Sequence, residues 1–241
     1  RCHAHYLAKG GSLKKMLAEI YGKKTGCSGG KGGSMHLIDL NCKFMGSSAI
    51  VGNSIPIGVG LALSAKIKKT KQISYVFLGD GAIEEGVFYE ALNFTIIKKL
   101  PVVFICENNL YSVYSPLSVR QPKGRKISNM CRSIGINSIS CNGNDALKVF
   151  KCLEKVSKYV RKKKRPYFVE FDTYRWLEHC GPNLDNNIGY RSEKEFKIWK
   201  KKDPLLILKD KFPKNKIKKI NLIEQKIKKE IKSAFLFAER S

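Results

Sequence analysis

Short apolar runs alternate with longer amphipathic segments through the centre of the chain. The runs Ile73–Leu78, Val102–Cys106 and Tyr167–Phe171 are rich in Val, Ile, Phe and Tyr, which predicts strands buried on both faces. Apolar residues recur at helical spacing in the segments between them, Glu84–Lys99 and Asp145–Lys164. Strands that alternate with helices favour a parallel sheet with right-handed crossovers, so the chain is predicted to have an α/β fold.

The same periodicity predicts which helical side chains face inward. In the segment 84–99 they are Val87, Ala91, Leu92, Thr95 and Ile96. In the segment 145–164 they are Leu147, Phe150, Leu153, Val156 and Val160. Further helices are predicted over Leu13–Tyr21, with Met16, Leu17 and Ile20 on one face, over Pro56–Lys69 and Leu205–Lys211, and around Ile223, Ile227, Ile231 and Phe235.

Gly-rich and polar segments predict the loops. The segment Gly22–Gly33 is too polar and flexible for a helix, so we expect a loop that lets a ligand or another chain approach closely. The segment Leu177–Arg191, rich in Gly, Pro and Asn, predicts a second loop. We therefore expect one α/β domain over residues 1–191 and a helical C-terminal extension over residues 192–241.

Composition narrows the class of protein. The 241 residues are 43% hydrophobic, which is enough for a core and excludes a mainly disordered chain. No stretch approaches the roughly 20 apolar residues of a membrane span. The net charge of +26 would suit a polyanionic partner, but Lys is spread over many segments and no nucleic-acid-binding motif accompanies it. Nucleic-acid binding remains the rival interpretation from another class.

Eight cysteines raise the alternatives of disulfides and metal binding. No two of them have the two-residue spacing of a zinc or redox motif, and Cys106 and Cys152 fall within predicted core elements. We therefore expect free thiols in a reducing compartment, by default the cytoplasm. The chain opens on Arg1 without a signal-peptide pattern, and we expect residues upstream of it.

Polar residues follow two neighbouring predicted strands. Gly79-Asp80-Gly81 follows the first strand, and Glu107-Asn108-Asn109 follows the second, with one helix between them. Because the carboxyl ends of parallel strands meet at one edge of a sheet, where ligands bind in such folds, Asp80 and Asn109 are expected to lie close together.

Their chemistry indicates a magnesium diphosphate. Carboxylate and amide oxygens suit Mg²⁺ or Ca²⁺ rather than zinc, and Mg²⁺ usually completes its shell with phosphate oxygens. The turn at Gly81 and the helix start nearby offer N–H groups to that phosphate. Glu84 and Glu85 are interpreted as partners of the helix dipole, not as catalytic acids.

These residues carry a resemblance to a known family. The segment GDGAIEEGVFYEALNFTIIKKLPVVFICENNLYSVYS is similar to the thiamine-diphosphate motif of the alpha subunits of 2-oxo acid dehydrogenase first components, of the pyruvate and acetoin dehydrogenase type. Four further segments match in order: GGKGGSMH at 29–36, IVGNSIPIGVGLAL at 50–63, TYRWLEHCGPN at 173–183 and KDPLLILKD at 202–210. The resemblance covers nearly the whole chain and implies the thiamine-diphosphate-binding fold.

The resemblance also implies site residues, position by position. Asp80, Asn109 and the carbonyl of Tyr111 would ligate magnesium. The expected cofactor contacts are Arg1, Ala49, Val51, Asp80, Gly81, Ala82, Asn109, Tyr111 and His179. His179 and His3 are the candidate catalytic residues, with a surface role as the alternative for His3; His36 is expected to be structural. Cys180 stands where mitochondrial members carry a phosphorylated serine, so that control is expected to be absent.

The implied activity is an oxidoreductase reaction that this chain shares with other subunits. It would decarboxylate a small 2-oxo acid, pyruvate first and acetoin as the alternative, and pass the acyl group to a lipoyl-bearing acyltransferase. The family's catalytic glutamate belongs to a separate beta subunit, so an assembly of two alpha and two beta subunits is expected. A transketolase-like half-enzyme is a further alternative, disfavoured by the Asn108-Asn109 pair.

Overall fold

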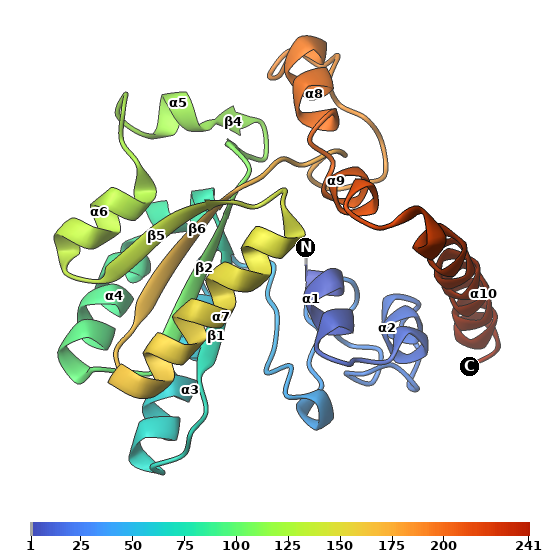
Figure 1. The fold of residues 1–241 in the computed structure, drawn as a ribbon. Helices are drawn as coiled ribbons and strands as arrows, with labels where there is room; N and C mark the ends of the chain where they lie inside the picture. Colours follow the sequence, from blue (N-terminus) through green and yellow to red (C-terminus); the bar gives the residue numbers. More distant parts are fainter. Residues whose placement is uncertain (1) are drawn as a thin grey trace. The chain divides into compact units, whose positions relative to one another are not determined.

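The computed structural model describes residues 2–241 and divides them into two compact units. The sheet unit comprises residues 51–211, and the helical unit comprises residues 2–50 and 212–241 (Figure 1). Each unit is described by itself below. These units have other limits than the two domains expected from the sequence, whose boundary at residue 191 stays a prediction. No helix that the structure describes combines the length and apolarity needed to span a membrane.

The sheet unit is built on four parallel strands in the order β1-β2-β6-β5. Their bounds are β1 Ser74–Gly79, β2 Val102–Asn108, β5 Asn137–Asn142 and β6 Tyr167–Asp172. The three predicted strands are confirmed as β1, β2 and β6. The fourth, β5, was not predicted because its sequence NSISCN is polar and lies at the edge of the sheet.

Helices cover both faces of this sheet (Figure 1). The sheet unit contains α3 Ser54–Ile67, η2 Asp80–Glu84, α4 Gly86–Lys98, α5 Leu117–Arg120, α6 Ile127–Ile134, α7 Ala146–Lys163, α8 Glu193–Lys200 and α9 Pro204–Asp210. A short hairpin follows β2 and consists of two strands of two residues each, β3 Tyr111–Ser112 and β4 Ser115–Pro116. The predicted α/β fold is confirmed.

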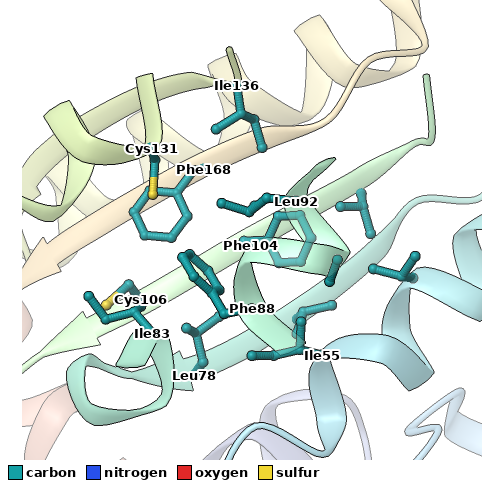
Figure 2. Close-up of a cluster of buried hydrophobic side chains, with 14 of the residues drawn as sticks. Ile55, Leu78, Ile83, Phe88, Leu92, Phe104, Cys106, Cys131, Ile136 and Phe168 are labelled. Carbon is teal, nitrogen blue, oxygen red and sulfur yellow. The ribbon is translucent and has the colours of Figure 1, made fainter. Parts of the chain in front are cut away.

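Helices cover strand β2 on both faces, which explains why its residues 102–106 are all apolar. Val102, Phe104 and Cys106 point to the face packed by α3, α4 and α6 (Figure 2). Val103 and Ile105 point to the opposite face, where α7 packs. Because both faces are covered, every position from 102 to 106 is buried.

The prediction for α7 was partly wrong. Val156 and Val160 are buried as expected, but Leu147 and Phe150 are 46% and 68% exposed. The inward stripe instead runs through Val149, Cys152 and Leu153 to Val156 and Val160. Leu147 and Phe150 lie off that stripe, since successive residues turn about 100° around a helix.

The helical unit contains α1 Cys2–Ala8, α2 Leu13–Ile20, η1 Leu40–Cys42, η3 Lys214–Lys216 and α10 Ile217–Arg240. The last helix packs Ala234 and Ala238 against Leu17 and Ala18 of α2. The residues that predicted α10 are exposed by 40% to 49% in the structure, namely Ile223, Ile227, Ile231 and Phe235. Ile20, expected on the inner face of α2, is 37% exposed, because Glu19 takes the buried position beside it.

Candidate functional site

The carboxyl ends of β1 and β2 meet as the sequence predicts. Gly79 at the end of β1 pairs in register with Glu107, so Asp80 and Asn108 follow this last pair at the same edge of the sheet. The one-turn helix η2 begins at Asp80, and the β3–β4 hairpin begins at Tyr111. Two short polar turns therefore share this edge of the sheet.

Asp80 is buried, with 1% of its surface exposed. Its carboxylate forms an ion pair with Arg120 of α5, whose side chain is 11% exposed. The same guanidinium contacts Glu84 Oε1 at 2.5 Å and donates from Nε to the carbonyl of Ser115 at 3.1 Å. Arg120 thus connects helix α5, which follows the hairpin, to the turn after β1, and no sequence pattern predicts this pairing.

Gly81 allows the β3–β4 hairpin to approach the turn after β1 closely. A Cβ atom at this position would lie 2.5 Å from Ser112 Oγ and 2.9 Å from Ser112 Cβ. Any side chain would therefore push the hairpin away from the turn. Ala82, the next predicted cofactor contact, is buried against the core below.

The two asparagines after β2 have different partners. The buried Asn108 donates from Nδ2 to Glu170 Oε1 at 2.9 Å, and Glu170 also accepts from the N–H of Ser128 at 2.9 Å. Asn109 Oδ1 accepts from the N–H of Tyr111 at 3.1 Å, and Leu110 between them has a φ of 72°. Asn108 therefore holds the strand end in place, and Asn109 shapes the turn that presents Tyr111.

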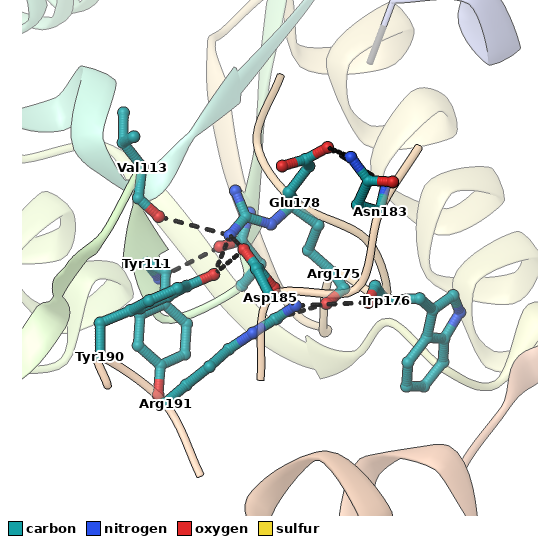
Figure 3. A network of polar contacts seen from close by, with 10 residues as sticks. Tyr111, Val113, Arg175, Trp176, Glu178, Asn183, Asp185, Tyr190 and Arg191 are labelled. Atoms are coloured by element: carbon teal, nitrogen blue, oxygen red, sulfur yellow. Dashed lines mark hydrogen bonds and ion pairs between the residues drawn. The ribbon is translucent and has the colours of Figure 1, made fainter. Parts of the chain in front are cut away.

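His179 lies in a short turn that is closed by hydrogen bonds between Glu178 and Asn183, and Figure 3 shows these two residues. The N–H and side-chain amide of Asn183 donate to Glu178 Oε1 at 3.1 and 2.8 Å, and the N–H of Glu178 donates to the carbonyl of Asn183 at 2.9 Å. The ring of His179 is half-buried, and Cys180 beside it is exposed.

The segment carrying His179 is anchored to the β3–β4 hairpin. Tyr111 donates its hydroxyl proton to Glu195 Oε2 at 2.7 Å, and its ring meets the ring of Tyr190 edge-on at 5.3 Å. Arg175 donates to the carbonyl of Val113 at 3.3 Å (Figure 3). The structure therefore brings the Asn109–Tyr111 turn and the His179 segment to one side of the sheet unit.

Asp185 is the centre of this anchor. It is 2% exposed, and it pairs with Arg191 and Arg175 and accepts from the hydroxyl of Tyr190 (Figure 3). Burial raises the pKa of Asp185, but the hydrogen bonds from Tyr190 and Arg191 outweigh that effect and leave its pKa below the usual value. Burial and the bond to Asp185 raise the pKa of Tyr190 to about 12. The sequence analysis did not predict this network. The only signal available for it was the presence of Arg and Asp residues in and beside the predicted loop Leu177–Arg191.

The remaining predicted residues fall in different places. Val51 belongs to the sheet unit, and Gly52 after it lies against Glu85, so this segment adjoins the turn after β1. Ala49 and His3 belong to the helical unit. The ring of His3 contacts the carbonyl and hydroxyl of Ser34 there. Arg1 lies outside the described residues.

The edge offers hard oxygen ligands. The residues expected to ligate a metal carry a buried carboxylate at Asp80, an amide oxygen at Asn109 and a backbone carbonyl at Tyr111, and these donor types suit Mg²⁺. Across residues 2–241, no three His, Cys, Asp or Glu side chains are grouped closely enough for a metal site built from those residue types alone. The donor chemistry therefore fits a cation that completes its shell with ligand oxygens.

Comparison with known proteins identifies relatives along the whole chain. The family described as dehydrogenase E1 component matches residues 1–241. The chain is 39% identical over 244 residues to the pyruvate dehydrogenase E1 component subunit alpha of Rickettsia felis, covering all of this chain and 74% of that protein.

Two further relatives show the spread of activities among similar proteins. The testis-specific mitochondrial pyruvate dehydrogenase E1 alpha subunit of Rattus norvegicus is 35% identical over 99% of this chain and 60% of its own length. The alpha subunit of acetoin:2,6-dichlorophenolindophenol oxidoreductase of Bacillus subtilis is also 35% identical, over all of this chain and 72% of its own length.

Proposed function

This chain belongs to the dehydrogenase E1 component family, and on that premise we propose that it is the alpha subunit of a thiamine-diphosphate-dependent 2-oxo acid dehydrogenase. Its reaction is the oxidative decarboxylation of a small 2-oxo acid, with pyruvate as the first candidate. The observation that carries the proposal is the buried Asp80 beside the Asn109–Tyr111 turn, at the carboxyl edge of a parallel sheet.

The residues present fit a magnesium diphosphate. Asp80, Asn109 Oδ1 and the carbonyl of Tyr111 would hold Mg²⁺, and the backbone at Gly81 and Ala82 would contact the diphosphate. The absence of a side chain at Gly81 supports this assignment, because it lets the β3–β4 hairpin, which begins at Tyr111, lie close to the turn after β1. When bound, thiamine diphosphate supplies the electron-accepting chemistry for decarboxylation.

The protein's own part in the reaction is binding and orientation. Asp80 would neutralise and orient the metal, and the segment around Asp185 would hold His179 near the diphosphate. His3, Ala49, Val51 and Arg1 are further proposed contacts, because each stands where the family has a residue at the active site or cofactor. Half-burial of His179 inside a closed turn supports a fixed ring orientation there.

A beta subunit and a lipoyl-bearing acyltransferase are the proposed partners, in an assembly of two alpha and two beta subunits in the cytoplasm. The sheet unit exposes large apolar side chains on its helices, which favours protein contacts. They include Ile57 at 52%, Ile67 at 70%, Ile97 at 64% and Phe150 at 68% exposure.

The proposal about the cofactor is tested by Asp80→Ala in the co-expressed alpha–beta complex. We expect thiamine diphosphate affinity in the presence of Mg²⁺ to fall by at least tenfold, since an essential ligand is lost. Asp210→Ala, a change at an exposed aspartate of α9, is the matched control and should bind like the wild type. Unchanged binding by Asp80→Ala would overturn the assignment.

The substrate is tested by comparing pyruvate, larger 2-oxo acids and acetoin with the same complex. Reduction of 2,6-dichlorophenolindophenol reports turnover of each compound without the acyltransferase. The proposal expects pyruvate to give the highest kcat/KM. Turnover of acetoin alone would assign the chain to the activity named for the Bacillus subtilis relative.

A further inference from the structure

A buried glutamate lies at the centre of the helical unit. Glu19 of α2 is 0% exposed, and its carboxylate accepts hydrogen bonds from backbone N–H groups of the Gly-rich loop. The bond lengths are 2.7 Å from Ser28, 2.9 Å from Gly30 and 2.6 Å from Gly32. One carboxylate therefore fixes the path of a loop that the sequence predicted to be flexible.

Glycines in the Gly-rich loop allow its backbone to pass close to Glu19. A Cβ at Gly26 would lie 2.6 Å from Glu19 Cα, and a Cβ at Gly30 would lie 2.6 Å from the carbonyl oxygen of Gly22. A Cβ at Gly32 would collide with the carbonyl of His36. Gly30 and Gly33 also have φ values of 78° and 58°, which favour glycine. The loop is shaped around the carboxylate.

The pKa of Glu19 is consistent with an ionised carboxylate that accepts hydrogen bonds from the loop. Burial raises its pKa, but the backbone N–H groups of Gly30, Gly32, Ser28 and Gly33 lower it by more, so the pKa of Glu19 lies below the usual value. The carboxylate is therefore charged at neutral pH. Three N–H donors require an acceptor with several lone pairs, which an ionised carboxylate provides.

The loop ends on a histidine contact. Ser34 follows Gly33 directly, and its carbonyl lies 2.8 Å from His3 Nε2. The Ser34 hydroxyl lies 3.1 Å from the same nitrogen. A carbonyl can only accept, so this bond requires the proton of a neutral His3 ring on Nε2 and leaves Nδ1 as the acceptor.

We propose that Glu19 is a positioning residue for His3. Glu19 holds residues 28–33, the loop holds Ser34, and Ser34 fixes the tautomer and orientation of the His3 ring. The inference rests on the proposed function in one respect, namely that His3 acts in that reaction. In this proposal, a buried helix residue fixes the ring tautomer and orientation of a histidine 16 positions earlier in the chain.

The test is Glu19→Gln in the full chain, with Glu230→Gln of α10 as the control at an exposed position of the same unit. The amide puts an N–H₂ group against N–H donors, so at least one hydrogen bond is lost. We expect hydrogen exchange of residues 28–33 to accelerate about 10- to 100-fold, the effect of losing one charged hydrogen bond. We also expect ¹⁵N chemical shifts of His3 to change from the Nε2–H tautomer to a mixture.

Faster exchange with an unchanged His3 tautomer would overturn the proposal, because Glu19 would then support the loop alone. If Glu19→Gln fails to fold, Gly33→Ala replaces it, since a Cβ there meets open space but strains the backbone beside Ser34. An unaltered His3 tautomer in Gly33→Ala would equally overturn the proposal. The spectra are recorded without cofactor, so failure of thiamine diphosphate to bind the wild-type complex would count against the proposed function and not against this result.

Discussion

At the scale of single residues, the ion pair between Asp80 and Arg120 is the feature with the most direct chemical consequence. Metal-ligating carboxylates are usually held by an outer partner that fixes their orientation. Arg120 contacts Asp80 through Nη2 and is itself fixed by Glu84 and the carbonyl of Ser115. Its guanidinium is therefore placed to orient the proposed metal ligand.

We expect Arg120→Gln to weaken Mn²⁺ binding, measured by electron paramagnetic resonance, by about 10- to 100-fold. Arg120→Lys should recover part of that loss because it keeps the charge without the planar fork. Tighter Mn²⁺ binding by Arg120→Gln would contradict this expectation and would mean that the guanidinium competes with the cation.

Gly81 gives a prediction about stability. Gly81→Ala should lower the free energy of unfolding by about 1–3 kcal/mol, since the added methyl group overlaps the side chain of Ser112. Gly86→Ala is the matched control, because a Cβ there meets nothing within 4 Å. Urea denaturation of both variants measures the difference, and equal stability would show that the hairpin moves aside freely.

Sequence reasoning reached part of this site. Asp80 and Asn109 were predictable because each follows a buried strand, and strand ends in a parallel sheet converge. Arg120 was not, because it lies in a one-turn helix without an apolar pattern and pairs with a residue 40 positions earlier in the chain. Glu19 was not, because a charged residue between apolar positions on a helix ordinarily faces water.

At the scale of elements, the helices and strands with long apolar patterns were the ones that the sequence predicted accurately. Strands β1, β2 and β6 and helices α4 and α7 have strong apolar signals and were placed within about two residues. Strand β5 is an edge strand with alternating small polar residues, and α6 and α8 are two-turn helices with few apolar positions in their sequences. Tertiary contacts, and not local pattern, decide such elements.

The segment around Asp185 gives a prediction about pH. Because the pKa of Asp185 is lowered in the folded protein, its ionised form adds stability above the ordinary Asp value of about 4, and that contribution is lost as the pH falls through the lowered value. Hydrogen exchange of residues 173–192 should therefore stay constant, after correction for intrinsic rates, from pH 7 to about 5 and lose protection below about 4.

Asp185→Ala should remove that protection already at pH 7, at a cost of about 3–5 kcal/mol, since it leaves the buried Arg191 without its carboxylate. Loss of protection in the wild type between pH 6 and 7 would contradict the assignment to Asp185.

At the scale of the whole molecule, the residues expected from the family resemblance are divided between the two compact units. Asp80, Asn109, Tyr111 and His179 lie in the sheet unit, and His3 and Ala49 lie in the helical unit. The sequence predicts an α/β domain over residues 1–191 and a helical extension over residues 192–241, because its pattern indicates elements and not which distant segments pack together. The association of residues 212–241 with residues 2–50 rests on contacts between α2 and α10, such as Leu17 with Ala234, which no local pattern encodes.

In the proposed function, this chain holds a magnesium diphosphate in a site that a beta subunit completes. Calorimetric titration of thiamine diphosphate with Mg²⁺ tests this arrangement, on the chain alone and on its complex with a co-expressed beta subunit. We predict binding that is at least tenfold tighter in the complex. No binding by a complex whose association is shown separately would contradict it.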